Sequence, residues 1–264
     1  MSDHTILTTI DDRGIATLTM NRPALHNAFD DVLIADLTAV LKRLDADGQV
    51  RAVCLASSGK SFSAGADLNW MKRMAGYTRE QNLADANGLA ELMRTLNSLS
   101  KPTIALVQGA AYGGGVGLVA CCDIAIGTGR ATFCLSEVKL GLLPAVISPY
   151  VIAAIGQRAA RRYFLTAEVM NASEAMHIGL LHEVVVDEAA LLLRGEALVE
   201  ALLNNGPKSV AASKELIATV ASKPVEATLI ADTAGRIADQ RSSTEGREGV
   251  AAFLEKRKPN WVKG

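Results

Sequence analysis

The 264-residue sequence has almost no excess of either charge and no long uninterrupted apolar segment. Its 27 Lys and Arg residues against 28 Asp and Glu residues give a formal net charge of −1. A nucleic-acid-binding surface would need clustered basic residues, so we expect no nucleic-acid partner. No apolar segment reaches the roughly 18 residues that a membrane-spanning helix needs, so we expect no membrane partner either.

The spacing of the cysteines and histidines favours neither disulfides nor a metal site. The four cysteines are Cys54, Cys121, Cys122 and Cys134, and no two of them have C-x-x-C spacing. Three lie within apolar segments, which favours buried thiols in a reducing compartment. No pair of the four histidines has metal-ligand spacing. Residues 1–4 lack the charged and apolar regions of a secretory signal, and we therefore expect a cytoplasmic location.

Apolar residues, in contrast, are plentiful at 49%, enough for a large α/β core. Up to Pro144, segments typical of strands alternate with segments of helical spacing. This alternation predicts βαβ units and a largely parallel sheet. The expected strands are residues 5–9, 15–20, 51–56, 103–107, 123–127 and 131–134, and the expected helices are residues 30–44, 82–99 and 116–121.

Beyond Pro144 helical spacing dominates, and only residues 183–186 are typical of a strand. We therefore divide the chain into an α/β core, residues 1–200, and a helical C-terminal region, residues 201–264. The expected helices are residues 148–155, 158–165, 173–177, 188–203, 207–220, 225–241 and 244–256. The last two carry more apolar residues than a small appendage needs, which predicts packing against another subunit. These residues include Leu229, Ile230, Ile237, Val250, Phe253 and Leu254.

Two partial motifs do not support a nucleotide or ester hydrolase. Residues 58–61 (SGKS) match the end of a phosphate-binding loop, but Cys54 stands where the leading glycine is required. Residues 61–65 (SFSAG) resemble a nucleophile elbow without its first glycine.

Two turns rich in glycine and alanine are better candidates for chemistry. Residues 62–68 (FSAGADL) and 109–115 (GAAYGGG) each follow a predicted buried strand, and the second opens a helix. Small residues let a ligand approach the backbone, and a helix N-terminus offers unpaired N–H donors. Adjacent parallel strands would bring both turns to one sheet edge, where two N–H groups could form an oxyanion hole. Spacing alone is equally compatible with tight strand-to-helix connections.

Several blocks in a fixed order resemble the enoyl-CoA hydratase/isomerase (crotonase) family over nearly the whole chain. The resemblance implies an α/β fold, a crotonase-like spiral of ββα units with a C-terminal helical trimerisation region. It also implies an acyl-CoA thioester substrate, no cofactor beyond the coenzyme A of that substrate, and a homotrimer or homohexamer. The blocks are residues 20–23 (MNRP), 27–28, 61–68, 109–123, 133–144 and 249–259.

The resemblance also implies roles for single residues. The backbone N–H groups of Ala66 and Gly114 would donate to the thioester oxygen, and Glu137 would be the catalytic carboxylate. Residues expected at the substrate and its coenzyme A are Ala64, Asp67, Leu68, Asn69 and Lys256, of which Lys256 would lie near the CoA phosphates of its own or a neighbouring subunit.

The chain departs from the family pattern at Gly117, where family hydratases carry a second glutamate. We expect the glycine to leave space for a water or for part of a branched substrate. Glu137 would then have to handle one water that supplies both the hydroxyl group and the proton. Isomerisation of a 3-enoyl to a 2-enoyl thioester, in contrast, needs only one base.

Residues 115–123 and 141–150 resemble bacterial methylglutaconyl-CoA hydratases of leucine breakdown, which share this glycine. They favour an enoyl-CoA hydratase for a short or branched 2-enoyl-CoA, with 3-methylglutaconyl-CoA as the best single substrate. The alternatives are a Δ3,Δ2-enoyl-CoA isomerase with Glu137 as its only base and a non-catalytic CoA-thioester binder. Lys72, Arg73 or Arg79 could bind a distal substrate carboxylate, although a solvated helix face is the favoured interpretation of all three.

Overall fold

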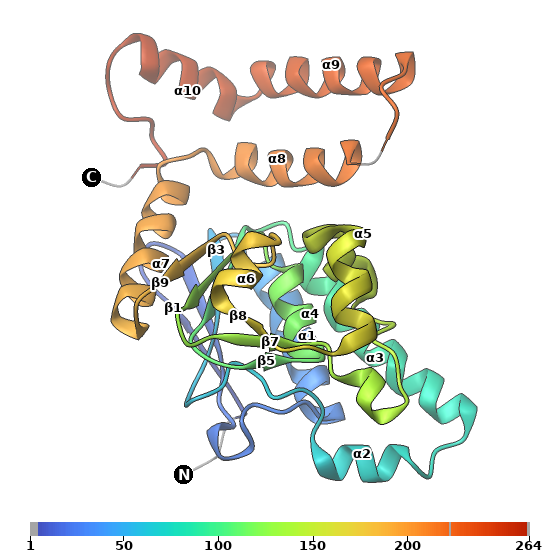
Figure 1. The fold of residues 1–264 in the computed structure, drawn as a ribbon. Coiled ribbons are helices and arrows are strands. Elements are labelled where there is room, and N and C mark those ends of the chain that lie inside the picture. The colour runs from blue at the N-terminus through green and yellow to red at the C-terminus, as the bar shows by residue number, and fades with distance from the viewer. Residues whose placement is uncertain (1–4, 222, 263–264) are drawn as a thin grey trace.

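A six-stranded sheet lies at the centre of the computed structural model, which describes residues 5–221 and 223–262 (Figure 1). The first two strands, both predicted, form an antiparallel hairpin, and every later pair in this sheet is parallel. In sheet order the strands are β1 (Ile6–Ile10), β2 (Ile15–Met20), β3 (Ala52–Ser57), β4 (Thr103–Val107), β6 (Ile124–Thr128) and β9 (Glu183–Val185).

A second, smaller sheet has the order β5 (Ala111–Tyr112), β7 (Thr132–Cys134) and β8 (Met170–Asn171). The sequence predicted β7 but neither β5 nor β8, because two residues are too few to show an alternating pattern. Together the sheets and helices confirm the predicted α/β class.

The helices on one face of the large sheet are held by apolar residues at helical spacing. Helix α1 (Asp31–Ala46) begins at the N-cap Asp30, whose carboxylate accepts the Leu33 N–H, and it packs on α3 (Arg79–Asn97). Thr78 and Gln81 form a capping box at the start of α3. The residues that these two helices bury are Leu33, Ile34, Leu37, Leu41, Leu44, Leu92, Met93, Thr95 and Leu96.

Helix α4 (Gly114–Cys121) lies between α3 and α5 (Ser148–Thr166) and is apolar on all sides, as a fully enclosed helix must be. Its first residue, Gly114, is half-buried. The backbone leaves helical geometry at Gly156, with φ 72°, so the two helices predicted at residues 148–155 and 158–165 are halves of one kinked element. The structure adds α2 (Leu68–Met74) and two short 3₁₀ segments, η1 (Pro23–Leu25) and η2 (Glu137–Leu140).

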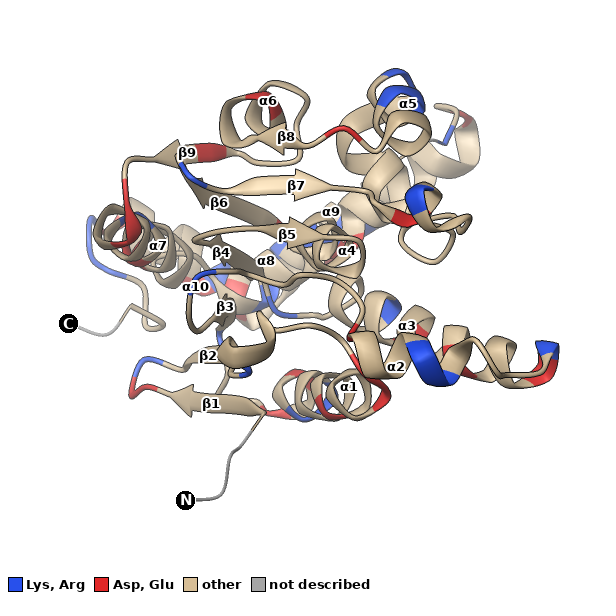
Figure 2. Cartoon of the chain, turned by 60° about the horizontal axis from the view of Figure 1, so that its bottom comes forward, with Lys and Arg blue, Asp and Glu red and all other residues tan. Residues whose placement is uncertain are grey.

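Helix α7 (Glu188–Leu203) covers the other face of the large sheet and follows α6 (Ala172–His177) and β9. Both faces of the parallel strands are thus buried, which explains their continuous apolar character. Figure 2 shows these strands largely free of charge, with basic and acidic residues interspersed on helices and connections. The core residues on this face are Ile15, Ala52, Cys54, Ile104, Leu106, Ile126, Leu191 and Val199.

All four cysteines are free and buried, as predicted. Burial raises the pKa of the Cys54 thiol to about 11 and that of the Cys122 thiol to about 12, so neither is a thiolate near neutral pH.

The C-terminal helices α8 (Pro207–Val220), α9 (Ala227–Ser242) and α10 (Thr244–Leu254) form a separate layer beside the core (Figure 1). Lys214 of α8 joins this layer to the core through Asp123, with 2.7 Å between the charged atoms. Helix α7 passes residue 200 and ends at Leu203, and the division of the chain into domains at that residue stays a prediction. In the described part of the chain, no helix is both long and apolar enough to cross a membrane.

Candidate active site

The two glycine- and alanine-rich turns lie in contact at one edge of the large sheet. Strands β3 and β4 pair in parallel, with Val53 opposite Thr103, so both turns leave the same edge. The turns also pair with each other: the Ser63 N–H donates to the Ala110 carbonyl at 3.0 Å, and the Tyr112 N–H donates to the Ser63 carbonyl at 2.8 Å. The structure thus brings together the two segments that the sequence singled out.

Glycine is required at the point where the turns touch. Gly65 has φ 89° and Gly113 has φ 50°, in the left-handed region that other residues rarely adopt. A Cβ atom on residue 65 would lie 3.2 Å from the Tyr112 carbonyl oxygen, and one on residue 113 would lie 3.9 Å from the Gly65 Cα. The absence of both side chains allows the two backbones to approach closely.

The Ala66 N–H points away from the backbone that holds this turn. Phe29 donates its N–H to the Gly65 carbonyl and accepts the Asp67 N–H, each at 2.7 Å. Because neighbouring residues of an extended segment point in opposite directions, the N–H between them, that of Ala66, faces the other side. It has no hydrogen-bond partner among the described residues.

The Gly114 N–H is free for a different reason. Gly114 is the first residue of α4, and the first N–H groups of a helix have no partner within the helix. Nothing in the described ranges accepts this N–H either. The two free donors, Ala66 and Gly114, each follow directly after one of the two contacting glycines. Such a pair can donate to one oxygen and stabilise negative charge on it.

Glu137 lies beside this pair of donors, at the start of η2. Its Oε1 atom is 3.4 Å from the position that a Cβ on Gly113 would occupy. Its Oε2 atom is buried and has no hydrogen-bond partner in the described structure. Burial raises the pKa of the Glu137 carboxyl above 4.5, against one backbone hydrogen bond that lowers it. A carboxyl group whose pKa is raised by burial holds its proton more readily than a solvated one and can act as base and then as acid.

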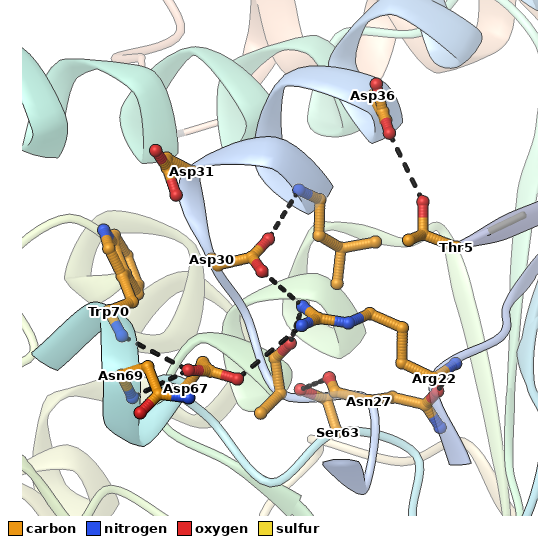
Figure 3. A network of polar contacts seen from close by, with 12 residues as sticks. Thr5, Arg22, Asn27, Asp30, Asp31, Asp36, Ser63, Asp67, Asn69 and Trp70 are labelled. Carbon is orange, nitrogen blue, oxygen red and sulfur yellow. Dashed lines mark hydrogen bonds and ion pairs between the residues drawn. The ribbon is translucent and has the colours of Figure 1, made fainter. Parts of the chain in front are cut away.

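The residues predicted at the coenzyme A differ in exposure. Ala64, Leu68 and Asn69 are exposed, and Leu68 retains 73% of its accessible surface. The Asp67 side chain, in contrast, is turned into the protein, where it accepts the N–H groups of Asn69 and Trp70 at the start of α2 (Figure 3). Within this chain Asp67 therefore anchors the turn.

Lys256 is not brought to the turns within one chain. It follows α10, which lies at the opposite end of the molecule from α2 (Figure 1). A contact of Lys256 with the CoA phosphates therefore stays a prediction, which a neighbouring subunit would fulfil more easily than the same chain. Of the three candidate cations on α2 and α3, all are exposed and Arg73 already pairs with Asp31 at 2.5 Å.

The expectation of open space at Gly117 is wrong. A Cβ atom on residue 117 would overlap Cγ2 of Ile147, and it would lie 2.9 Å from the Ile147 Cβ and 3.1 Å from the Met93 Sδ. Gly117 lies where α4 packs against the start of α5, and the missing side chain lets these helices approach. Ile147 thus fills the place next to α4 that we expected to be free.

Sequence reasoning gave no role to Arg22 or Asn27, which contact Asp67 and Ser63 of the Ala66 turn (Figure 3). Asn27 is fully buried, and its side-chain amide donates to the carbonyls of Ser58 and Ser61 at 2.8 and 2.9 Å. Both residues belong to the N-terminal blocks of the family resemblance, which was the available signal.

Comparison with known proteins assigns the chain to a family. The family model described as enoyl-CoA hydratase/isomerase matches residues 11–264. The short-chain-enoyl-CoA hydratase of Clostridium acetobutylicum is 32% identical over 246 residues, which are 92% of each chain.

Solved structures agree. An enoyl-CoA hydratase from Shewanella pealeana has 47% identity and a TM-score of 0.95, over 98% of this chain and 97% of that one. A Legionella pneumophila protein described as an enoyl CoA hydratase/isomerase (crotonase) has 48% identity and a TM-score of 0.92, over 97% and 98% of the two chains. The chain therefore belongs to the enoyl-CoA hydratase/isomerase family, whose enzymes act on acyl-CoA thioesters, and the predicted crotonase-like fold is confirmed.

Proposed function

We propose that this protein is an enoyl-CoA hydratase that adds water to a short or branched 2-enoyl-CoA. The observation that carries the proposal is the carboxyl group of Glu137, which lies beside the turn of the free Gly114 N–H and has a buried oxygen without a partner in the part of the chain that the structure describes. Relatives named enoyl-CoA hydratase support the direction of the reaction.

In this mechanism the thioester oxygen accepts hydrogen bonds from the Ala66 and Gly114 N–H groups. These bonds stabilise the enolate that forms when water adds to C3, and loss of one such donor costs on the order of 10²–10³ in rate. Glu137 accepts one proton of the water as its oxygen bonds to C3. Glu137 then returns that proton to C2, so that the product contains the whole water molecule. A raised pKa suits both steps, because the group must act first as base and then as acid.

An isomerase that uses Glu137 alone is the second candidate function. The observation that favours it is the packing at Gly117, where Ile147 leaves no room for the second glutamate of the family pattern. Moving a proton from C2 to C4 of a 3-enoyl thioester needs one base and no water. A CoA-thioester binder without turnover remains the third candidate.

For the acyl group, we propose 3-methylglutaconyl-CoA as the first substrate to test. Its support is the resemblance of residues 115–123 and 141–150 to methylglutaconyl-CoA hydratases. Lys72 or Arg79 would bind its distal carboxylate more readily than Arg73, because Arg73 would first have to leave Asp31. The reaction needs no cofactor besides the coenzyme A of the substrate.

One ultraviolet assay separates the three candidates. Hydration of crotonyl-CoA or 3-methylglutaconyl-CoA removes the absorbance of the conjugated thioester, whereas isomerisation of a 3-enoyl-CoA creates it. A binder changes neither signal but retains affinity for the thioester. Loss of absorbance that requires the protein supports the hydratase, and turnover of the 3-enoyl-CoA alone would replace it by the isomerase.

A further inference from the structure

We propose that Arg22 is a positioning residue for the Ala66 N–H, because its guanidinium group joins the two helix caps that hold this donor in place. The proposal rests on the proposed oxyanion role of Ala66. Arg22 touches neither of the free N–H groups, so any effect of Arg22 on turnover must pass through the backbone between Arg22 and the Ala66 N–H.

The guanidinium group is enclosed by two carboxylates. The Nη1 atom of Arg22 lies 2.8 Å from Oδ2 of Asp30, and Nη2 lies 3.6 Å from Oδ2 of Asp67 (Figure 3). Nη1 also donates to the Ala28 carbonyl at 3.0 Å. The Arg22 side chain is 15% exposed, and those of Asp30 and Asp67 are 19% and 9% exposed. Two partly buried carboxylates neutralise the arginine, so it is poorly suited to bind an anionic ligand.

The remaining oxygen of each carboxylate caps a helix. Oδ1 of Asp30 accepts the Leu33 N–H at 2.8 Å at the start of α1. Oδ1 of Asp67 accepts the Asn69 N–H at 2.8 Å and the Trp70 N–H at 3.2 Å at the start of α2. Arg22 therefore ties together the N-termini of two helices that are not adjacent in the sequence.

These caps flank the peptide that carries the donor. Asp67 directly follows Ala66, and Asp30 directly follows Phe29, the residue that bonds to Gly65 and Asp67 on either side of Ala66. The contacts form a closed ring from Arg22 through Asp30 and Phe29 to Asp67 and back to Arg22. A ring of this kind restricts rotation of the Ala66 peptide, and with it the direction of its N–H.

A second set of contacts holds the same segment. The Arg22 N–H donates to the Asn27 side-chain oxygen at 2.8 Å. Ser63 donates its hydroxyl to the Asn27 carbonyl at 2.9 Å, and the same hydroxyl accepts the Gly65 N–H at 3.4 Å. The backbone of the Ala66 turn is thus held from residue 63 to residue 67 by the segment that begins at Arg22.

An oxyanion donor that is misdirected loses more in the transition state than in the bound substrate, because negative charge on the oxygen develops only during the reaction. Arg22→Met is therefore expected to lower kcat by about 10- to 100-fold with little change in KM. Asp67→Asn keeps a side-chain oxygen for the α2 cap but weakens the ion pair, so it should lower kcat similarly with a smaller loss of stability.

The double variant Arg22→Met/Asp67→Asn tests whether the two residues act through one ion pair. If they do, its loss of kcat should be much smaller than the product of the two single losses.

Lys214→Met is the matched control. Lys214 also forms a partly buried ion pair, with Asp123, and its side chain is 17% exposed, but the pair joins α8 to the core away from the turns. This variant should lose thermal stability as Arg22→Met does and keep the kcat of the wild type.

Arg22→Lys tests whether the geometry of the guanidinium group matters. It should restore only part of kcat, since an ammonium group cannot reach two carboxylates with the fork geometry of arginine.

Binding of acetoacetyl-CoA tests the proposal without turnover. This β-ketothioester forms an ultraviolet-absorbing enolate when a site stabilises its oxygen. We expect the wild type to show the enolate band, and Arg22→Met to lose most of it while binding the ligand within about 3-fold of the wild-type affinity. An unchanged band in Arg22→Met would overturn the positioning role and leave the oxyanion site intact. If the wild type binds without any enolate band, the oxyanion role of Ala66 fails, and the role of Arg22 fails with it.

Discussion

At the scale of single residues, the carboxyl group of Glu137 is central to the site, because one of its oxygens is buried and has no hydrogen-bond partner among the described residues. Glu137→Gln keeps the shape of the side chain and removes its ability to carry a proton. We expect turnover of the preferred enoyl-CoA to fall by at least about 10²-fold while the dissociation constant for the thioester stays nearly unchanged. Stopped-flow turnover and direct binding measure the two quantities, and a variant as fast as the wild type would remove Glu137 from the mechanism.

The same burial makes the stability of the protein depend on pH. Because burial raises the folded-state pKa of Glu137 above 4.5, the folded state binds more protons than the unfolded state between the two pKa values. The destabilising effect of this residue is therefore absent below pH 4.5 and grows as pH rises through the folded pKa. Glu137→Gln should be more stable than the wild type at pH 7, by on the order of 1 kcal/mol. Chemical denaturation at both pH values should show that the difference vanishes at pH 4, and equal stability at pH 7 would contradict it.

Gly117 decides how closely α4 and α5 pack. Gly117→Ala should lower the free energy of unfolding by about 1–3 kcal/mol, because the clash of the added Cβ with Ile147 outweighs the gain in helix propensity.

Gly117→Glu should abolish activity on crotonyl-CoA and 3-methylglutaconyl-CoA alike, since the obstruction is the protein core rather than the substrate. Combining Gly117→Ala with Ile147→Ala should recover part of the stability lost by Gly117→Ala. A stable Gly117→Glu variant that loses activity only on 3-methylglutaconyl-CoA would instead support the expectation that Gly117 leaves space for the substrate.

At the scale of elements, the start of α4 and the start of η2 act as one unit, because the Gly113 backbone lies against the Glu137 carboxylate. Gly113 has φ 50° and ψ −120°, a conformation open to glycine alone. Gly113→Ala should therefore lower kcat at least about 10-fold and destabilise the fold by about 1–3 kcal/mol. Gly156→Ala, at the kink of α5, meets similar backbone strain, and apart from the adjacent helix backbone no described atom lies within 4 Å of the new Cβ. That control should lose stability and keep kcat, and equal activity of both variants would separate the α4 turn from catalysis.

At the scale of the whole molecule, the C-terminal layer leaves large apolar side chains uncovered. Phe253 is 81% exposed, Leu254 72% and Val250 58% on α10, and Ile230 and Ile237 are 56% and 50% exposed on α9. Such a surface favours burial against further subunits, and a closed ring of three or two stacked rings would cover it. Sedimentation at micromolar concentration should show a trimer or a hexamer, and Phe253→Asp should shift it towards smaller species. Leu7→Asp, on β1, serves as the control, and a wild-type monomer would contradict the assembly.

The amino-acid sequence alone determined those features that depend on local pattern. Residues 103–107, 188–203 and 207–220 were predicted with the bounds of β4, α7 and α8, because apolar spacing and terminal residues mark such elements along the chain itself. Helix α2 was missed because a helix of seven residues shows too little periodicity. For the site, residue spacing did not decide whether the two turns form an oxyanion hole or only connect strands to helices. The family resemblance supplied the roles of Ala66, Gly114 and Glu137.

Only the tertiary structure decided which residues meet across long separations in the chain. It placed Ile147 against Gly117, joined Asp30 to Asp67 through Arg22, and separated Lys256 from the turns within one chain. The physical reason is that a periodic pattern reports which face of an element is buried but not what buries it. The sequence pattern around a glycine in an apolar helix is the same whether a substrate, a water or an isoleucine of the next helix lies opposite. The packing of α4 on α5 determines which it is.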